Sequence, residues 1–222
     1  DIRKKGHSGI SFEIDPLSSS NNFHFNLNKN YKERVSKLLV AGDDSQTLSF
    51  LQSIPKDNTD YLILSKLAGL VWLFQKEEPL KSLKWFLGLE NKKAPKNILS
   101  DLACYKSLAY YYSGKKIKIS GRKDKAVGYF KKGLKSLRVC QGGNHSQDHF
   151  LVQAFSSSLT HFYKGLFWYQ IWAVNKNKRA QELALSSWEK SAKISNDKRL
   201  KSYAQKNQKT LRVALKVNKK NG

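Results

Sequence analysis

The side chains best suited to chemistry in this chain are a cysteine and two histidines that lie close together in the sequence. Cys140, His145 and His149, with Asp148 alongside, could offer one thiolate and two imidazoles to zinc or copper. The two histidines would share one face of a helix because they are four residues apart. Their spacing matches no established metal motif, and Gly142-Gly143 indicates a loop, so we predict neither a metal site nor a bound cofactor.

The sequence holds none of the common catalytic motifs. It has no GxSxG elbow, no Walker-type glycine loop, no HExxH and no carboxylate pair in an apolar setting. Its adjacent acidic residues, Asp43-Asp44 and Glu77-Glu78, fall in predicted turns, where capping of helix N-termini explains them. We therefore expect a protein that is not an enzyme.

Cys104 and Cys140 are the two cysteines, too few for a disulfide scaffold or, by themselves, for a structural zinc site. Both fall in one predicted helical hairpin, so a bridge between them is conceivable, and export would favour it. A count of residues around the connecting loop, however, sets Cys104 nearer Lys132 than Cys140. This count argues against the bridge.

Positive charge dominates the composition, with 41 Lys and Arg against 17 Asp and Glu and a formal net charge of +24. Such a charge coats the surface and attracts an acidic partner, although a solvated basic coat is the alternative interpretation. Lysine is a point charge, so nucleic acid would be held through its backbone, without sequence preference. The candidate basic surface consists of Lys115, Lys116, Lys118, Arg122, Lys123, Lys131, Lys135 and Arg138.

Tyrosine and tryptophan form the third candidate set, because they combine a large contact area with a polar group and are common at binding hot spots. Ordinary packing between helices is the competing interpretation. We assign Tyr112, Phe130 and Trp168 to packing. The candidate anchors of a partner-binding groove are Tyr105, Tyr111, Tyr169 and Trp172.

The elements that must position these residues are helices. The stretch Phe150–Val174 contains one glycine and no proline, which predicts one long helix. Its apolar residues occupy two sides, so we expect it to lie between neighbouring helices. A membrane span fits poorly, because serines and the polar residues His161, Lys164 and Gln170 interrupt the run.

Helical periodicity divides the rest of the chain into hairpins. Residues 1–30 are polar, lack this period and are predicted to be an extended arm or tether. Residues 31–222 are predicted to be one all-α domain, in which 113–121 forms a basic loop. Its elements are antiparallel hairpins at about 31–55, 60–95, 98–141 and 147–195, followed by a capping helix at 197–217.

The second helices of these hairpins share an aromatic residue flanked by small ones, a self-similarity that indicates a helical repeat. The aligned aromatic residues are Phe50, Phe86, Phe130 and Trp188, with small residues at Ser82, Ala126, Gly133, Ala184 and Ser191. This pattern resembles the tetratricopeptide repeat (TPR). The resemblance is best in the third hairpin, through Leu108-Ala109, Tyr112, Ala126, Phe130 and Gly133.

The resemblance implies an α-solenoid of stacked hairpins whose first helices build a concave, protein-binding face, with no catalytic residues. We accordingly expect a non-enzymatic scaffold or adaptor for another protein with an acidic surface or peptide. The alternative is a binder of a polyanion, either nucleic acid or an anionic wall or lipid polymer. The chain contains no methionine and begins without an apolar signal segment, which indicates a processed or truncated product. We favour an exported or periplasmic location over a cytoplasmic one, with membrane association only through a removed N-terminal region.

Overall fold

The computed structural model describes residues 44–56, 61–90, 96–142 and 156–220. Within these residues the chain forms eight α-helices and one π-helical turn and has no strand, which confirms the predicted all-α class. The arm 1–30, the predicted first helix from residue 31 and the segment 143–155 lie outside the described residues. The elements are α2 (Asp44–Gln52), α3 (Tyr61–Leu70), η1 (Val71–Gln75), α4 (Pro79–Glu90), α5 (Lys96–Ile119), α6 (Lys123–Gly142), α7 (Ser157–Asn175), α8 (Lys178–Ile194) and α9 (Lys198–Lys220).

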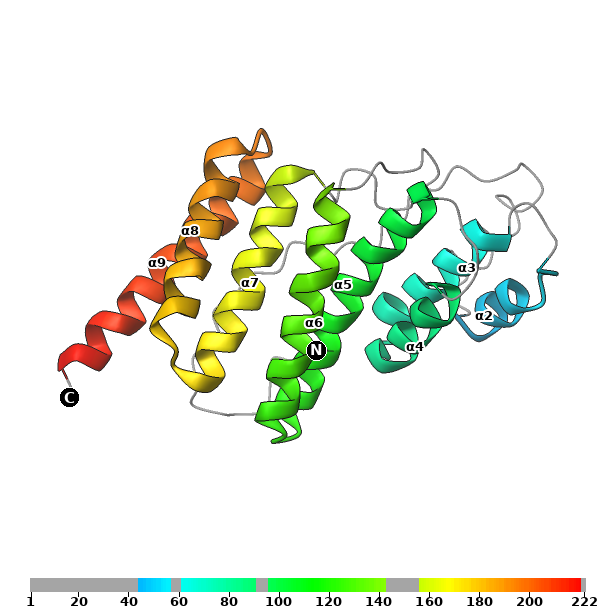
Figure 1. Ribbon diagram of the computed structural model, residues 1–222, viewed down its shortest axis with the longest axis horizontal. Coiled ribbons are helices and arrows are strands. Elements are labelled where there is room, and N and C mark those ends of the chain that lie inside the picture. Colours follow the sequence, from blue (N-terminus) through cyan, green and yellow to red (C-terminus); the bar gives the residue numbers. More distant parts are fainter. Residues whose placement is uncertain (1–43, 57–60, 91–95, 143–155, 221–222) are drawn as a thin grey trace.

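The helices follow one another along the long axis of the molecule in chain order, from α2 at one end to α9 at the other (Figure 1). Each helix packs against the next, and α3 also contacts α5 while α7 contacts α9. One continuous hydrophobic core runs through all of them, from Leu48 in α2 to Leu211 in α9.

Three consecutive helix pairs use the same packing device, a glycine on the first helix that receives an aromatic ring from the second. A Cβ atom built on the glycine would lie 2.2, 2.5 or 2.4 Å from the nearest ring atom, so no larger residue fits without a shift. We call these the glycine–aromatic pairs. They are Gly69 with Phe86 (α3 and α4), Gly114 with Phe130 (α5 and α6), and Gly165 with Trp188 (α7 and α8).

The two members of a glycine–aromatic pair are 17, 16 and 23 residues apart in the three successive helix pairs. The separation in the α3–α4 pair is one residue longer than in the α5–α6 pair. This additional residue is explained by η1, because an i→i+5 turn encloses one residue more than an α-turn. The seven additional residues of the third equal about two α-helical turns. Both changes in length therefore return the ring to the same side of its helix.

The predicted basic loop at 113–121 is wrong, because α5 continues as a helix to Ile119. Its last turns have tertiary partners: Ile117 is buried, and the Lys118 Nζ donates to Gln170 Oε1 of α7 at 2.6 Å. The connection to α6 is a tight turn in which Gly121 adopts a φ of 83°, a conformation that glycine takes without strain.

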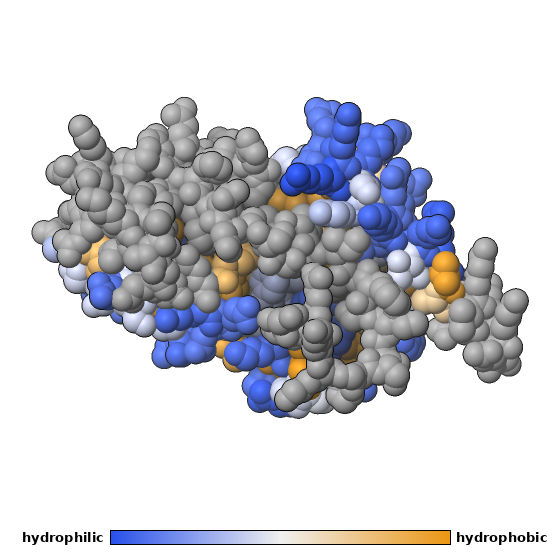
Figure 2. Space-filling model, turned by 180° about the vertical axis from the view of Figure 1, so that it is seen from behind, coloured by the Kyte–Doolittle hydropathy of each residue, from blue (hydrophilic) through white to orange (hydrophobic). Residues whose placement is uncertain are grey.

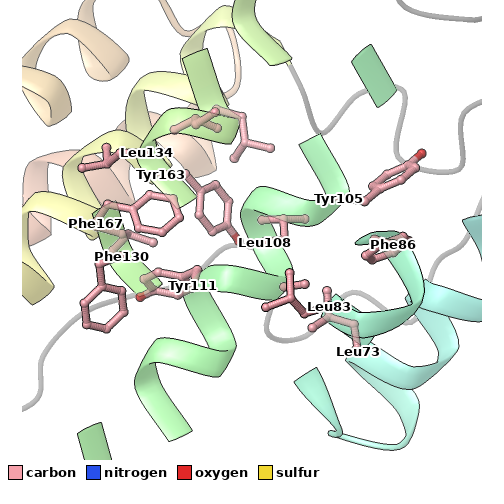
Figure 3. Close-up of a cluster of buried hydrophobic side chains, with 14 of the residues drawn as sticks. Leu73, Leu83, Phe86, Tyr105, Leu108, Tyr111, Phe130, Leu134, Tyr163 and Phe167 are labelled. Carbon is pink, nitrogen blue, oxygen red and sulfur yellow. The ribbon is translucent and has the colours of Figure 1, made fainter. Parts of the chain in front are cut away.

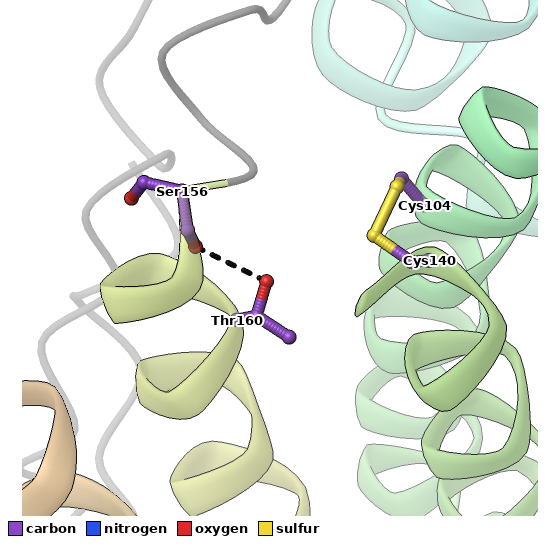
Figure 4. Close-up of a disulfide and its surroundings, with 4 residues drawn as sticks. All are labelled: Cys104, Cys140, Ser156 and Thr160. Carbon is purple, nitrogen blue, oxygen red and sulfur yellow. Dashed lines mark hydrogen bonds between the residues drawn. A yellow bond between two sulfur atoms is a disulfide. The ribbon is translucent and has the colours of Figure 1, made fainter. Parts of the chain in front are cut away.

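The prediction against a disulfide is also wrong, because Cys104 and Cys140 are bonded, with their Cα atoms 4.8 Å apart (Figure 4). The helical extension of α5 is the reason. The chain reverses direction at about residue 122, later than the predicted loop would place the reversal. The antiparallel helices α5 and α6 therefore bring position 104 opposite position 140.

The start of α7 is fixed by local capping rather than by the sequence period. The Ser156 hydroxyl accepts a hydrogen bond from the Leu159 amide at 3.3 Å. The Thr160 hydroxyl donates to the Ser156 carbonyl at 3.1 Å (Figure 4). The predicted helix Phe150–Val174 is therefore confirmed from Ser157 onward.

Candidate functional site

Two of the four candidate groove anchors, Tyr105 and Tyr111, have no exposed surface and belong to the core (Figure 3). Tyr105 stacks on Phe86 of α4 with ring centroids 5.9 Å apart. Tyr111 meets Tyr163 and Phe167 of α7 edge-on, at 5.8 and 5.4 Å. The structure corrects the prediction for both: their rings are buried between successive helix pairs, Tyr105 against α4 and Tyr111 against α7.

The other two candidates, Tyr169 and Trp172, come together near the end of α7. Their ring centroids are 5.8 Å apart, and Tyr169 also lies 5.9 Å from Trp188 of α8. Trp172 is 7% exposed, and the Lys176 Nζ lies 4.7 Å from its ring centroid as a cation–π contact. Tyr169 is half-buried, so it keeps some surface for a partner.

Three residues of the predicted basic surface, all on the last turns of α5, contact other parts of the chain. Lys118 bonds Gln170, as described above. The Lys115 Nζ lies 5.5 Å from the Tyr111 ring centroid, and the Lys116 Nζ approaches the Glu77 carbonyl at 3.5 Å. These lysines serve contacts within the molecule. Arg122, in the turn, is exposed and donates from Nε to the Ser120 hydroxyl at 3.2 Å.

The remaining predicted basic residues, Lys123, Lys131, Lys135 and Arg138, are all exposed on α6. Lys132, another basic residue of this stretch, is exposed beside them, three residues before Lys135. Val139, 54% exposed, follows Lys135 by one turn on the same side. We call this the α6 basic face: Lys131, Lys132, Lys135 and Arg138, together with Val139.

A second basic surface lies on α9. This helix carries nine basic residues and no acidic one, and its apolar side packs on α8 and α7. Figure 2 shows hydrophilic side chains gathered over the end of the molecule that α8 and α9 form. We call this the α9 basic face, which consists of the exposed residues Lys198, Lys201, Lys206, Lys209 and Arg212.

A buried ion pair that the sequence analysis missed joins α3 to α5. The Lys66 Nζ lies 3.1 Å from Asp101 Oδ2, and both side chains are almost completely buried. The signal was a lysine inside the apolar run of α3, YLILSKLAGL. Because a buried charge is stable only when paired, this contact fixes which residue of α5 lies opposite α3.

His161 of α7 is the one buried histidine among the described residues. Burial lowers the pKa of its imidazole, and the positive charges of Lys190 and Lys164 lower it further. The side-chain amide nitrogen of Gln141 lies 3.5 Å from His161 Nε2. An amide nitrogen can only donate, so this contact suits a neutral imidazole that accepts there.

Cys140, which was considered as a metal ligand, forms a disulfide with Cys104 and therefore has no thiolate to bind a metal. His145, Asp148 and His149 lie outside the described residues. Within the described ranges, no three His, Cys, Asp or Glu side chains gather as metal ligands would. No helix in the same ranges combines the length and the apolar character needed to cross a bilayer.

Comparison of the chain with protein-family models, with curated proteins and with solved structures gave no match.

Proposed function

We propose that this chain is a non-enzymatic scaffold, built as a TPR-like solenoid, that binds an acidic protein or peptide. The observation that carries the proposal is the repetition of one packing device in three successive helix pairs. Units that repeat their internal packing and contact only near neighbours form extended arrays, and such arrays expose long surfaces suited to binding.

Contacts between the first helices of successive pairs support the stacking. Lys66 of α3 pairs with Asp101 of α5, and Tyr111 of α5 packs on Tyr163 of α7. The helix α9 contacts α7 in the same sense, as the first helix of a further pair would. It therefore suits the role of a capping helix, with one side packed and the other covered by solvated charge.

Binding is favoured over catalysis by how the reactive side chains are used. The two thiols are joined to each other, Lys66 and Asp101 form an ion pair, and burial lowers the pKa of His161, which favours its neutral form. What the molecule presents to solvent on α6 and α9 is mostly positive charge: α9 carries no acidic residue, and Asp124 in the first turn is the one acidic residue of α6. Such a surface steers an acidic partner toward it.

The α9 basic face supports a second candidate, a binder of a polyanion such as nucleic acid or an anionic wall or lipid polymer. A helix with nine basic residues and no acidic one would neutralise several phosphates along a backbone.

We also propose that the chain is exported to an oxidising compartment. The Cys104–Cys140 disulfide supports this, because disulfides persist in secreted and periplasmic proteins and are rare in the reducing cytosol.

A pull-down from cell extract, with and without nuclease treatment and at about 0.1 M and about 0.5 M salt, tests the function. At the higher concentration the Debye length is only a few ångströms, so contacts between surface charges are screened. We expect a protein partner that is retained in stoichiometric amount at the lower salt concentration, whether or not nuclease is added. Recovery of nucleic acid or other polyanions alone, lost at high salt, would overturn the scaffold in favour of the second candidate.

A further inference from the structure

We propose that the α6 basic face is the docking surface for an acidic peptide segment of the partner, with carboxylates one helical turn apart and an apolar side chain that covers Val139. This inference rests on the proposed scaffold function and adds to it the surface and the chemistry of the ligand.

Helical geometry places the four cations on one side of α6. The opposite side is anchored in the core by Phe130, Leu134 and Leu137, all buried, so the basic residues must point to solvent. The four charges fall within eight residues, which corresponds to roughly 10 Å along the helix axis. A peptide in a helical conformation that carries carboxylates at i and i+4 would match this spacing.

The cations of this face are free to pair with a ligand. Within the described part of the chain, Lys131, Lys132, Lys135 and Arg138 make no hydrogen bond, ion pair or cation–π contact. Lysines elsewhere differ: Lys81 of α4 pairs with Glu78 at 3.0 Å, and Lys118 is held by Gln170. The acidic residue of α6 itself, Asp124, is two turns away in the first turn of the helix.

The face is also anchored at its C-terminal end. The Cys104–Cys140 disulfide ties α6 to α5 at the residue after Val139. A preorganised surface loses little conformational entropy when it binds, which leaves more of the interaction energy for affinity. The α9 basic face has no such covalent anchor, because the disulfide joins α5 to α6.

Val139 favours a peptide over a phosphate backbone as the occupant. An apolar side chain bordered by charge is the arrangement of a protein interface, whose apolar centre is surrounded by a polar rim. One turn before Lys131 and Lys132, Gly128 leaves open space, since no atom lies within 4 Å of where its Cβ would be. A peptide side chain can therefore lie close to the helix there.

The test measures binding of a fluorescein-labelled peptide, with five glutamates on either side of one leucine, by anisotropy at about 0.1 M salt. The triple variant Lys131→Glu, Lys135→Glu, Arg138→Glu is compared with Lys201→Glu, Lys206→Glu, Lys209→Glu on α9, which has the same net charge. We expect at least a tenfold loss of affinity for the α6 variant and less than about threefold for the α9 variant. Equal losses would overturn the proposal, because net charge alone would explain them.

Two further readouts keep the result interpretable. Val139→Ser should lower the affinity for the peptide severalfold and leave the affinity for heparin unchanged. Equal effects on both affinities would refute the proposal, because Val139 would then make no contact specific to the peptide. Far-ultraviolet circular dichroism checks that each variant is folded. If the α6 variant still retains the protein partner in the pull-down, the docking surface is refuted while the scaffold function stands; if the wild type retains no protein, the function itself fails.

Discussion

At the scale of single residues, the molecule's stability depends on a few positions where close packing or charge permits only one side chain. The glycine–aromatic pairs are of this kind, since the ring occupies the volume where a Cβ would be. The Lys66–Asp101 pair and the neutral His161 are others, because each places a titratable group where water cannot solvate its charge. Each of these positions makes a separate prediction.

Gly114→Ala should destabilise the fold by about 1–3 kcal/mol, because the new Cβ would meet the Phe130 ring at 2.5 Å and overpack the α5–α6 contact. Gly128→Ala is the matched control within the same hairpin. Its Cβ would meet open space, so the higher helix propensity of alanine should stabilise by about 0.5–1 kcal/mol. Urea unfolding of both variants measures the difference; equal effects of one sign would contradict the proposed close packing.

Asp101→Ala should cost about 3–5 kcal/mol of unfolding free energy, because it leaves the Lys66 ammonium buried without its partner. Replacing both residues, as Lys66→Met with Asp101→Leu, should recover most of this loss, since no buried charge then remains. Denaturant titration of the single and double variants checks the prediction. A double variant no more stable than the single one would show that packing, not charge, sets the cost.

His161 makes the fold sensitive to acid. Its pKa is lowered in the folded state, so the unfolded chain binds the proton more readily. The stabilising contribution is complete above the unfolded pKa of about 6.5 and is lost as the pH falls through the lower folded value. Thermal unfolding between pH 8 and pH 5 should show a falling Tm, and His161→Gln should flatten the profile in that window. An unchanged slope in the variant would assign the effect to other groups.

At the scale of elements, helix positions followed from the sequence wherever periodicity and local signals agreed. The end of α8 at Ile194 agrees with the end of the hairpin predicted at about 147–195, and Asn177 caps the start of this helix. The end of α5 was not predicted correctly, because a segment with Gly114 and several lysines is typical of a loop when only its own sequence is considered. Tertiary contacts stabilise the helical conformation of that segment: the Phe130 ring packs on Gly114, and Lys118 donates a hydrogen bond to Gln170.

The candidate sites show the same division. Residue types in the sequence suggested aromatic and basic candidates, but they could not separate buried side chains from exposed ones. Tyr111 is buried because α7 packs on it, a contact between residues far apart in the chain. The disulfide was missed for a related reason, since one wrong loop length shifts the register of two whole helices.

Loss of the Cys104–Cys140 bridge should destabilise the protein by about 3–4 kcal/mol, the chain-entropy value for a closed loop with a sequence separation of 36. Reductant should lower the Tm of the wild type and leave that of the double variant Cys104→Ser, Cys140→Ser unchanged. A variant that still responds to reductant would contradict this account. Calorimetry with and without dithiothreitol makes the comparison.

At the scale of the whole molecule, the net charge of +24 sets the behaviour in solution. Like charges repel across α6 and α9, which opposes the compact state and keeps the molecules apart. Thermal stability should therefore rise when sodium chloride increases from about 20 mM to about 500 mM, because screening weakens the repulsion. A Tm that falls over this range would mean that attractive ion pairs outweigh repulsion, and scanning fluorimetry at each salt concentration decides between them.

The separations of the glycine–aromatic pairs, 17, 16 and 23 residues, also restrict how such a chain can lengthen in evolution. An insertion preserves the fold only if the aromatic ring still packs on its glycine. One extra residue can be accommodated in a π-helical turn, and seven can be accommodated when each of the two antiparallel helices is about one turn longer. Insertions of two or five residues within the helices would turn the ring away from the neighbouring backbone. Natural variants of this protein should therefore differ in helix length by whole turns or single bulges, with all other length changes confined to the connections between hairpins.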